Sequence, residues 1–204
     1  MKAKERIPRC LAYCWLLASV LLFTSLQGGA SVAGALKGKR VLFVIFDRFD
    51  QSEYGKPRSI LERQGAHVTT ASSSRRPLQG YQGSVKLRAD LLLKDARMKE
   101  FDALVFVGGY RYESSNPETY RLVHEALRGK KPVAAICIAP VTLAKAGVIR
   151  GKRVTASTRF KTLKGAGGIL TGKNVERDGL LITANGPAAA EAFGHAIAAA
   201  LGGK

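Results

Sequence analysis

Short runs of apolar residues alternate with amphipathic stretches along residues 41–201. A continuous apolar run bounded by charge, such as 41–46 (VLFVIF), is typical of a strand buried on both faces in a parallel sheet. Apolar residues at helical spacing that end at a glycine, as in 52–64, predict helices. The predicted strands are 41–46, 66–71, 102–107, 132–136, 152–156 and 180–183; the predicted helices are 52–64, 117–128, 142–146 and 187–201; residues 72–83 form a loop or hairpin.

Strands that alternate with helices along a whole domain predict an α/β sandwich of three layers around a mostly parallel sheet. In such sheets ligands bind at the carboxyl ends of the strands. Glu53, the pair Gly108-Gly109 and Cys137 each follow a predicted strand. We therefore expect these residues to meet at one edge of the sheet and form a site.

Cys137 carries the strongest chemical signal, in the segment VAAICIAPVTLAKAG. A strand, a sharp turn and a helix are the context of a nucleophile elbow, and amides at a helix start favour a thiolate. An anion formed when the sulfur attacks a carbonyl group needs donors, for which the backbone N–H groups of Ile138 and Gly109 are the candidates. The alternative is a buried structural cysteine among alanines.

The segment AICIAP resembles the nucleophile elbow of the ThiJ/PfpI family, within the class I glutamine amidotransferase-like superfamily, which includes cysteine peptidases and deglycase- or glyoxalase-type proteins. Four more segments resemble the family in the same order, so that the likeness runs from about Lys39 to Gly203: FDRFDQSEY, DALVFVGG, LAKAGVIRGKRVTA and VERDGLLITANGPAAAEAF. The resemblance implies a flavodoxin-like fold and a homodimer. It also gives Glu53 a role, as a protonated carboxyl group that hydrogen-bonds to the sulfur of Cys137.

The sequence departs from the family pattern where relatives carry histidines. Ile138 follows the cysteine, and Ser157 in VTAST stands where other members have the histidine of a VTTHP-like segment. The three histidines are elsewhere, and we expect them to be structural or exposed: His67, His124 and His195. A Cys-His dyad and peptidase activity are therefore not predicted.

Two smaller features concern the surroundings of the predicted site. Asn185 stands where related members often have the arginine of an Arg-Gly-Pro segment, which removes an anion or dimer contact. Tyr110, which follows the glycine pair Gly108-Gly109, is a candidate for lining the pocket, although tyrosines equally often serve in packing.

Residues 1–35 have the pattern of a secretory signal, with a basic start, the apolar run 11–26 and a small-residue exit. We predict cleavage near Ala33 and export to the periplasm or the outside, with residues 36–204 as the folded domain. The alternative is an uncleaved N-terminal anchor. Cys10 and Cys14 lie in the signal, so Cys137 is the lone thiol of the mature domain.

The chain is strongly basic, with 33 Lys and Arg residues against 15 Asp and Glu residues and a formal net charge of +18. Most of this charge lies in residues 36–204, which predicts a weak attraction to anionic surfaces. The basic residues are scattered and no nucleic-acid-binding motif is present, so specific nucleic-acid binding is not predicted. Since neither metal-ligand spacing nor a phosphate-binding loop is recognisable, the prediction includes no metal and no cofactor.

These patterns predict an exported enzyme in which Cys137, with Glu53, acts on small reactive carbonyl compounds or as a cysteine-dependent hydrolase. One alternative is a redox-sensing or chaperone-like protein whose cysteine oxidises to sulfinic acid. A second alternative is a non-catalytic domain that binds through its basic surface.

Overall fold

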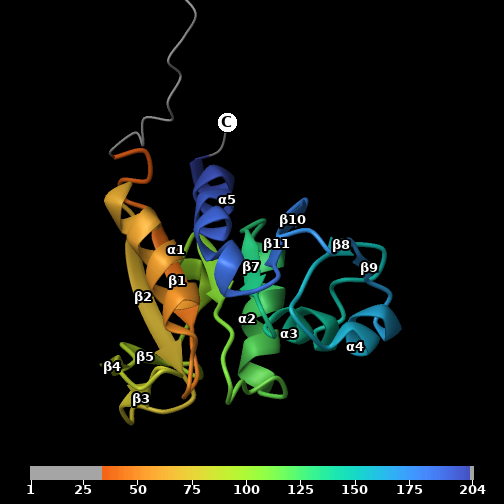
Figure 1. The fold of residues 1–204 in the computed structure, drawn as a ribbon. Helices are drawn as coiled ribbons and strands as arrows, with labels where there is room; N and C mark the ends of the chain where they lie inside the picture. Colours follow the sequence, from red (N-terminus) through yellow and green to blue (C-terminus); the bar gives the residue numbers. More distant parts are fainter. Residues whose placement is uncertain (1–33, 203–204) are drawn as a thin grey trace, which may run out of the picture. The chain divides into compact units, whose positions relative to one another are not determined.

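A seven-stranded sheet forms the centre of the protein in the computed structural model, which describes residues 34–202 (Figure 1). Neighbouring strands pair in parallel, except that the edge strand β10 runs antiparallel to β11. In spatial order the strands are β10 (Val175–Asp178), β11 (Leu181–Ala184), β7 (Val133–Ile136), β6 (Ala103–Phe106), β1 (Arg40–Val44), β2 (His67–Ser72) and β5 (Leu91–Leu92). Two short pairs lie outside it: β3 (Leu78–Gln79) with β4 (Lys86–Leu87), and β8 (Arg153–Val154) with β9 (Ile169–Leu170).

Helices cover both faces of the sheet, which buries two separate apolar cores. Alternate residues of β1 divide between these cores, with Val41 and Phe43 in one and Leu42 and Val44 in the other. Helices α1 (Gln51–Arg63) and α5 (Ala190–Gly202) pack on the first core. Helices α2 (Pro117–Arg128), α3 (Pro140–Lys145) and α4 (Phe160–Gly165) pack on the second. Two short 3-10 turns, Met98–Glu100 and Pro187–Ala189, complete the described elements. The flavodoxin-like three-layer fold predicted from the sequence is confirmed.

The order of the strands reverses direction at β1. From β1 the chain passes to β2 on one side, and it later returns to β6, β7 and β11 on the other. The connections that leave β1 and β6 therefore diverge at their carboxyl ends. Open α/β sheets bind ligands at this kind of switch point.

Most of the predicted elements are present, and the differences lie at the edge of the sheet. The strand predicted at 152–156 is β8, but it pairs with β9 and is not part of the central sheet. Strand β10 (VERD) and helix α4 were not predicted, because both are short and mostly polar. Within residues 72–83, the hairpin alternative is confirmed in part by the antiparallel pair β3–β4.

The predicted signal or anchor, residues 1–35, lies almost wholly outside the described residues. Among residues 34–202, every helix is too short or too polar to cross a membrane.

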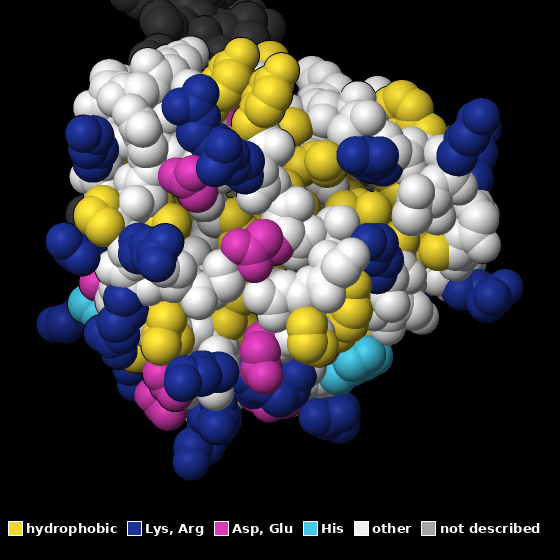
Figure 2. All heavy atoms as spheres, turned by 90° about the horizontal axis from the view of Figure 1, so that it is seen from below, with side chains coloured by type: hydrophobic (Ala, Val, Ile, Leu, Met, Phe, Trp, Pro, Cys, Tyr) yellow, Lys and Arg dark blue, Asp and Glu magenta, His cyan; other side chains and the backbone are white. Residues whose placement is uncertain are grey.

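Lys and Arg side chains dominate the charged surface at the end of the molecule towards which the parallel strands run. Figure 2 views this end from below, and it shows basic side chains around most of its margin with fewer acidic ones between them. The excess of positive charge agrees with the composition of the chain. It favours the approach of anionic ligands to this end.

Candidate active site

Cys137 lies in a sharp turn between β7 and α3. Its backbone is left-handed, with φ of +66°, a conformation that is rare for residues other than glycine and is common at functional turns. Two hydrogen bonds hold this turn: the N–H of Cys137 donates to the carbonyl of Ala184 (2.9 Å), and the N–H of Ser157 donates to the carbonyl of Cys137 (3.0 Å). The side chain is half-buried. The geometry is that of the predicted nucleophile elbow.

Glu53 lies in the first turn of α1 and is completely buried. Asp50 caps this helix by accepting hydrogen bonds from the N–H groups of Ser52 (2.9 Å) and Glu53 (3.1 Å). Oε2 of Glu53 accepts the N–H of Gly108 at 3.1 Å, and the carboxyl group also interacts with the thiol of Cys137. Oε1 is buried without a well-aligned partner among the described residues.

Gly108 is the point where the three segments of the site meet. A Cβ atom at this position would lie 2.6 Å from Cβ of Cys137 and 2.7 Å from Oε2 of Glu53, so only glycine fits. Because its N–H group already donates to Glu53, Gly108 is not a free donor for an oxyanion. The neighbouring Gly109 has φ of +153°, and its N–H donates to no acceptor among residues 34–202.

Burial perturbs both ionisable groups of the pair. Desolvation, assisted by the negative charge of Asp50, raises the pKa of Glu53 to about 8, so that this carboxyl group is mostly protonated at neutral pH. Desolvation and the charge of Glu53 raise the pKa of Cys137 to about 11. Hydrogen bonds from Ser157 and from the N–H of Ile138 lower the pKa of Cys137 only in part. The amide of Ile138 at the helix start favours the thiolate, as expected from the sequence, but the desolvation of the thiol outweighs this effect.

Ser157 contacts the sulfur directly, at the position where other members of the family have a histidine. Its Oγ donates a hydrogen bond to Sγ of Cys137 at 3.1 Å. The likeness of VTAST to the VTTHP-like segment was the signal for this position, because it predicts that the residue there faces the cysteine.

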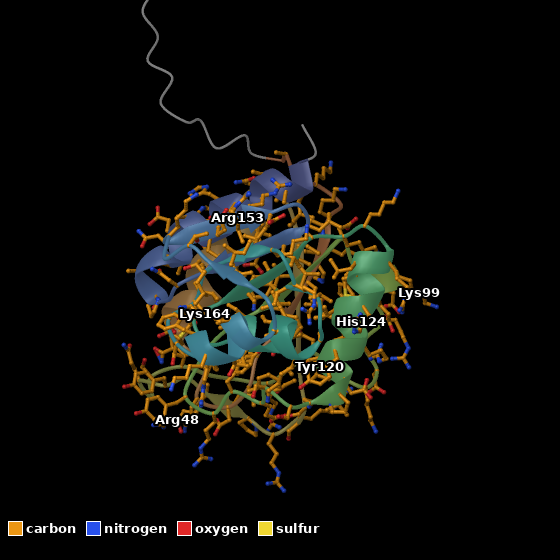
Figure 3. All side chains as sticks on the ribbon, turned by 90° about the vertical axis from the view of Figure 1, so that its right-hand side faces the viewer. Arg48, Lys99, Tyr120, His124, Arg153 and Lys164 are labelled. Carbon is orange, nitrogen blue, oxygen red and sulfur yellow. The ribbon has the colours of Figure 1, made fainter. Side chains whose placement is uncertain are left out.

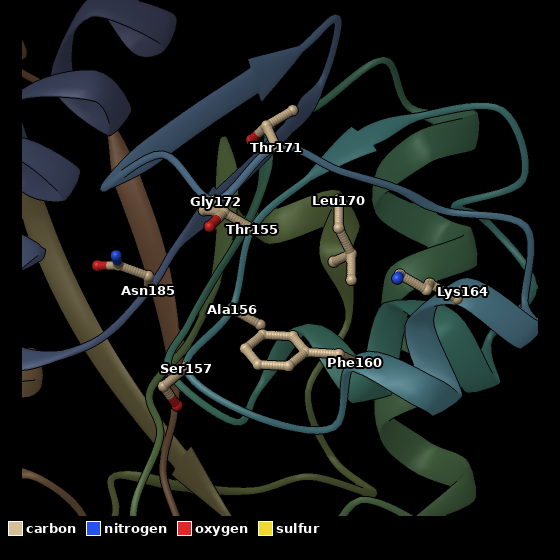
Figure 4. A pocket seen from close by; sticks show the side chains of 9 residues that line it. All are labelled: Thr155, Ala156, Ser157, Phe160, Lys164, Leu170, Thr171, Gly172 and Asn185. Carbon is tan, nitrogen blue, oxygen red and sulfur yellow. The ribbon is translucent and has the colours of Figure 1, made fainter.

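A pocket of about 700 Å³ opens beside Ser157 (Figure 4). Phe160, Lys164, Thr171 and Asn185 are among the residues that line it, and they come from α4 and the neighbouring loops. None of these residues was predicted to line a pocket. Asn185 was noted only for the arginine that it replaces, and Phe160 and Lys164 lie on α4, which was not predicted.

The other candidate residues lie apart from the sulfur. Tyr110 is 79% exposed and stacks on Tyr81, with ring centroids 5.1 Å apart, and it does not line the pocket of Figure 4. His67, His124 and His195 are exposed on β2, α2 and α5, and Figure 3 shows His124 on the outer helix α2. Within residues 34–202, no three His, Cys, Asp or Glu side chains are grouped so that they could hold a metal ion.

We expect Ser157→Ala to slow the alkylation of Cys137 by about three- to tenfold at neutral pH. Removal of the Ser157 hydroxyl withdraws a hydrogen bond that stabilises the thiolate, which raises the pKa of the thiol further. The measurement is the rate of reaction with iodoacetamide between pH 6 and 10, with modification read at the Cys137 peptide. Thr158→Ala, at the exposed neighbouring residue, is the control; equal rates in both variants would contradict the role of Ser157.

Comparison with known proteins relates this geometry to one family. The profile of the DJ-1/PfpI family matches residues 39–200. An uncharacterised protein of Methanocaldococcus jannaschii is 33% identical over 81% of this chain and 84% of its own length. A Pyrococcus abyssi protein named as a deglycase is 35% identical over 60% of this chain and 74% of its own length. The crystal structure of a ThiJ/PfpI domain protein from Brachyspira murdochii superposes with a TM-score of 0.77 at 28% identity, covering 81% of this chain and 97% of that one.

Proposed function

This chain belongs to the DJ-1/PfpI family, and we propose that it is a cysteine-dependent enzyme of deglycase or glyoxalase type that acts on reactive carbonyl compounds. The observation that carries the proposal is the buried carboxyl group of Glu53 against the sulfur of Cys137, at the elbow after β7. Relatives named as deglycases support the class of reaction.

The reaction begins when Cys137 attacks the aldehyde carbon of a 2-oxoaldehyde. The C–S bond forms as the electron pair of the C=O double bond moves to oxygen, and the thiol proton passes to the carboxylate of Glu53. We assign the N–H groups of Gly109 and Ile138 as donors to the new oxyanion; that of Gly109 has no acceptor among residues 34–202, whereas that of Ile138 also lies against the sulfur. The proton then passes from Glu53 to this oxygen and completes a hemithioacetal.

Glu53 next moves a proton between the two carbons of the substrate. The proton leaves the carbon that carries sulfur and is returned to the adjacent ketone carbon, while the hydroxyl proton of the first carbon passes to the ketone oxygen. The first carbon is thereby oxidised to a carbonyl group and the second is reduced to an alcohol. The product of this step is a thioester of a 2-hydroxy acid. Water hydrolyses the thioester, releases the acid and restores the thiol. The net reaction is oxoaldehyde plus water to 2-hydroxy acid, with no external oxidant.

The raised pKa of Glu53 suits this role. A general base works best when its pKa is near the working pH, and that of Glu53 is about 8. When the pair of Glu53 and Cys137 has lost one of its two protons, Glu53 is the ionised member, because its pKa is lower than that of Cys137. Its carboxylate then accepts the proton of the attacking thiol. Turnover is therefore expected to rise with pH through about 8.

The decisive experiment measures conversion of methylglyoxal to lactate by wild type and Cys137→Ala. We expect the variant to lose at least about a thousandfold in kcat/KM, because no other thiol of the described residues can form the adduct. Glu53→Gln should also lose turnover, and what activity remains should not rise near pH 8. Activity retained by Cys137→Ala would exclude the proposal.

Redox sensing by Cys137 is the alternative within the same site. The raised pKa of the thiol disfavours it at neutral pH, because peroxide oxidises the thiolate. Formation of a sulfinic acid at Cys137 without turnover of methylglyoxal would favour this function. Export, a homodimer and a weak contact with anionic surfaces remain predictions, which fractionation, sedimentation and salt-dependent vesicle binding test.

A further inference from the structure

The pocket beside the sulfur is much larger than a three-carbon aldehyde requires. Its volume of about 700 Å³ lies in the range of sites for drug-sized ligands, and the pocket is open to solvent. Cys137 itself is not among the lining residues, but Ser157 both lines the pocket and donates a hydrogen bond to Sγ of Cys137 at 3.1 Å, so one side chain links the pocket to the nucleophile. A substrate that fills this space extends well beyond its reacting carbonyl group.

Lys164 is the one charged residue among those that line the pocket. Lys164 on α4 lines it, and none of the lining residues is acidic. Within residues 34–202, Lys164 takes part in no salt bridge, whereas Lys173 in the following loop is paired with Glu176 at 3.3 Å. Figure 4 shows Lys164 with its ammonium group directed towards the interior of the pocket and on the opposite side from Ser157.

The remaining walls suit the body of an organic molecule between these two ends. The ring of Phe160 is 48% exposed and lies along the pocket, and Leu170 adds a second apolar surface. The hydroxyl of Thr155 is already used, since it donates to the carbonyl of Lys173 at 2.7 Å. Lys164 is therefore the charged group that a ligand of this pocket meets.

We propose that Lys164 is a specificity-determining residue that selects carbonyl substrates carrying an anionic group, a carboxylate or a phosphate. The anionic group binds Lys164 while the carbonyl carbon lies at Cys137, and the chain between them crosses the pocket along Phe160. This inference rests on the proposed function for the reaction at the carbonyl carbon. The selection of anions is a separate property of the pocket and can be tested separately.

The test compares two thiol reagents of similar shape, 3-maleimidopropionate and the uncharged N-ethylmaleimide. Rates of modification are read at the Cys137 peptide of the full chain by mass spectrometry. A pH of 9 is used so that a largely protonated thiol still reacts measurably. Lys164→Met should lower the ratio of the anionic to the neutral rate by up to about fivefold, as expected for one solvent-accessible ion pair. Lys164→Arg, which keeps the charge, should retain the wild-type ratio.

Lys161→Met is the matched control, because Lys161 lies on the same helix, is exposed and does not line the pocket. It removes the same charge from the protein and should leave the ratio unchanged. In wild type the ratio should fall in 0.5 M salt, since salt screens the pair. The inference would be overturned if the ratio of the anionic to the neutral rate were the same in wild type and Lys164→Met. It would also be overturned if Lys164→Met and Lys161→Met lowered this ratio equally. A selective fall together with activity in Cys137→Ala would uphold the anion site and reject the proposed reaction.

Discussion

At pH 9 the Glu53→Gln variant should be more stable to unfolding than the wild-type protein by several kcal/mol. The carboxyl group is completely buried and its pKa is raised to about 8, whereas in the unfolded chain it ionises near 4.5. A carboxyl group raised in this way stabilises the folded state fully only below its unfolded pKa, and this stabilisation is lost as the pH rises to about 8. Glutamine stays neutral at every pH. The difference in unfolding free energy between Glu53→Gln and wild type therefore grows from about pH 4.5 to about pH 8 and is constant above pH 8.

Urea unfolding at pH 4, 6, 8 and 9 measures this difference, and the thermal midpoint at pH 9 should rise by roughly ten degrees. Glu62→Gln on the same helix is the control, because Glu62 is exposed and forms only the surface pair with Arg58. If the unfolding free energies of wild type and Glu53→Gln change in parallel with pH, Glu53 ionises as an ordinary carboxyl group.

Gly108→Ala should destabilise the protein by about 2–3 kcal/mol and change the reactivity of Cys137 at the same time. A Cβ atom there would overlap both Cβ of Cys137 and Oε2 of Glu53, neither of which can move without breaking the turn or the hydrogen bond to Gly108. We expect the pH profile of Cys137 alkylation to shift, because the carboxyl group is displaced from the sulfur. Urea unfolding and the alkylation profile together measure both effects.

Gly55→Ala is the matched control for this substitution. Gly55 lies in α1, two residues after Glu53, and nothing lies within 4 Å of an added Cβ atom. The alanine should stabilise the helix by about 0.5–1 kcal/mol and leave the alkylation profile unchanged. A wild-type alkylation profile in Gly108→Ala would show that the close contact at Gly108 does not position the pair.

The central sheet and the meeting of Glu53, Gly108 and Cys137 were predictable from the sequence, because they depend on local patterns. Apolar runs bounded by charge mark the buried strands, and parallel strands bring the residues after them to one edge. The burial of Glu53 could not be read from its neighbours, since an acidic residue at a helix start is equally typical of a surface. The structure shows this burial, with the N–H of Gly108 donating a hydrogen bond to Oε2 of Glu53.

The ionisation of the pair and the pocket were not predictable in the same way. A pKa depends on how much water is removed and on which charges face the group, and the sequence showed only the neighbouring helix. The pocket depends on α4, a six-residue segment whose polar composition hides it. Lys164 was therefore one of many scattered basic residues until the fold placed it opposite Ser157.

Three segments that are distant in the sequence meet at Gly108, so the surroundings that raise the pKa of Cys137 form late in folding. Cys137 reaches its native surroundings only after β7 has paired with β6 and β11, and parallel pairings between distant segments form slowly. Until then it is an ordinary thiol with a pKa near 8.5, and at neutral pH it ionises more than a hundredfold more often than a thiol of pKa 11. We therefore expect adventitious oxidants and electrophiles to modify Cys137 faster in the incompletely folded chain than in the native protein.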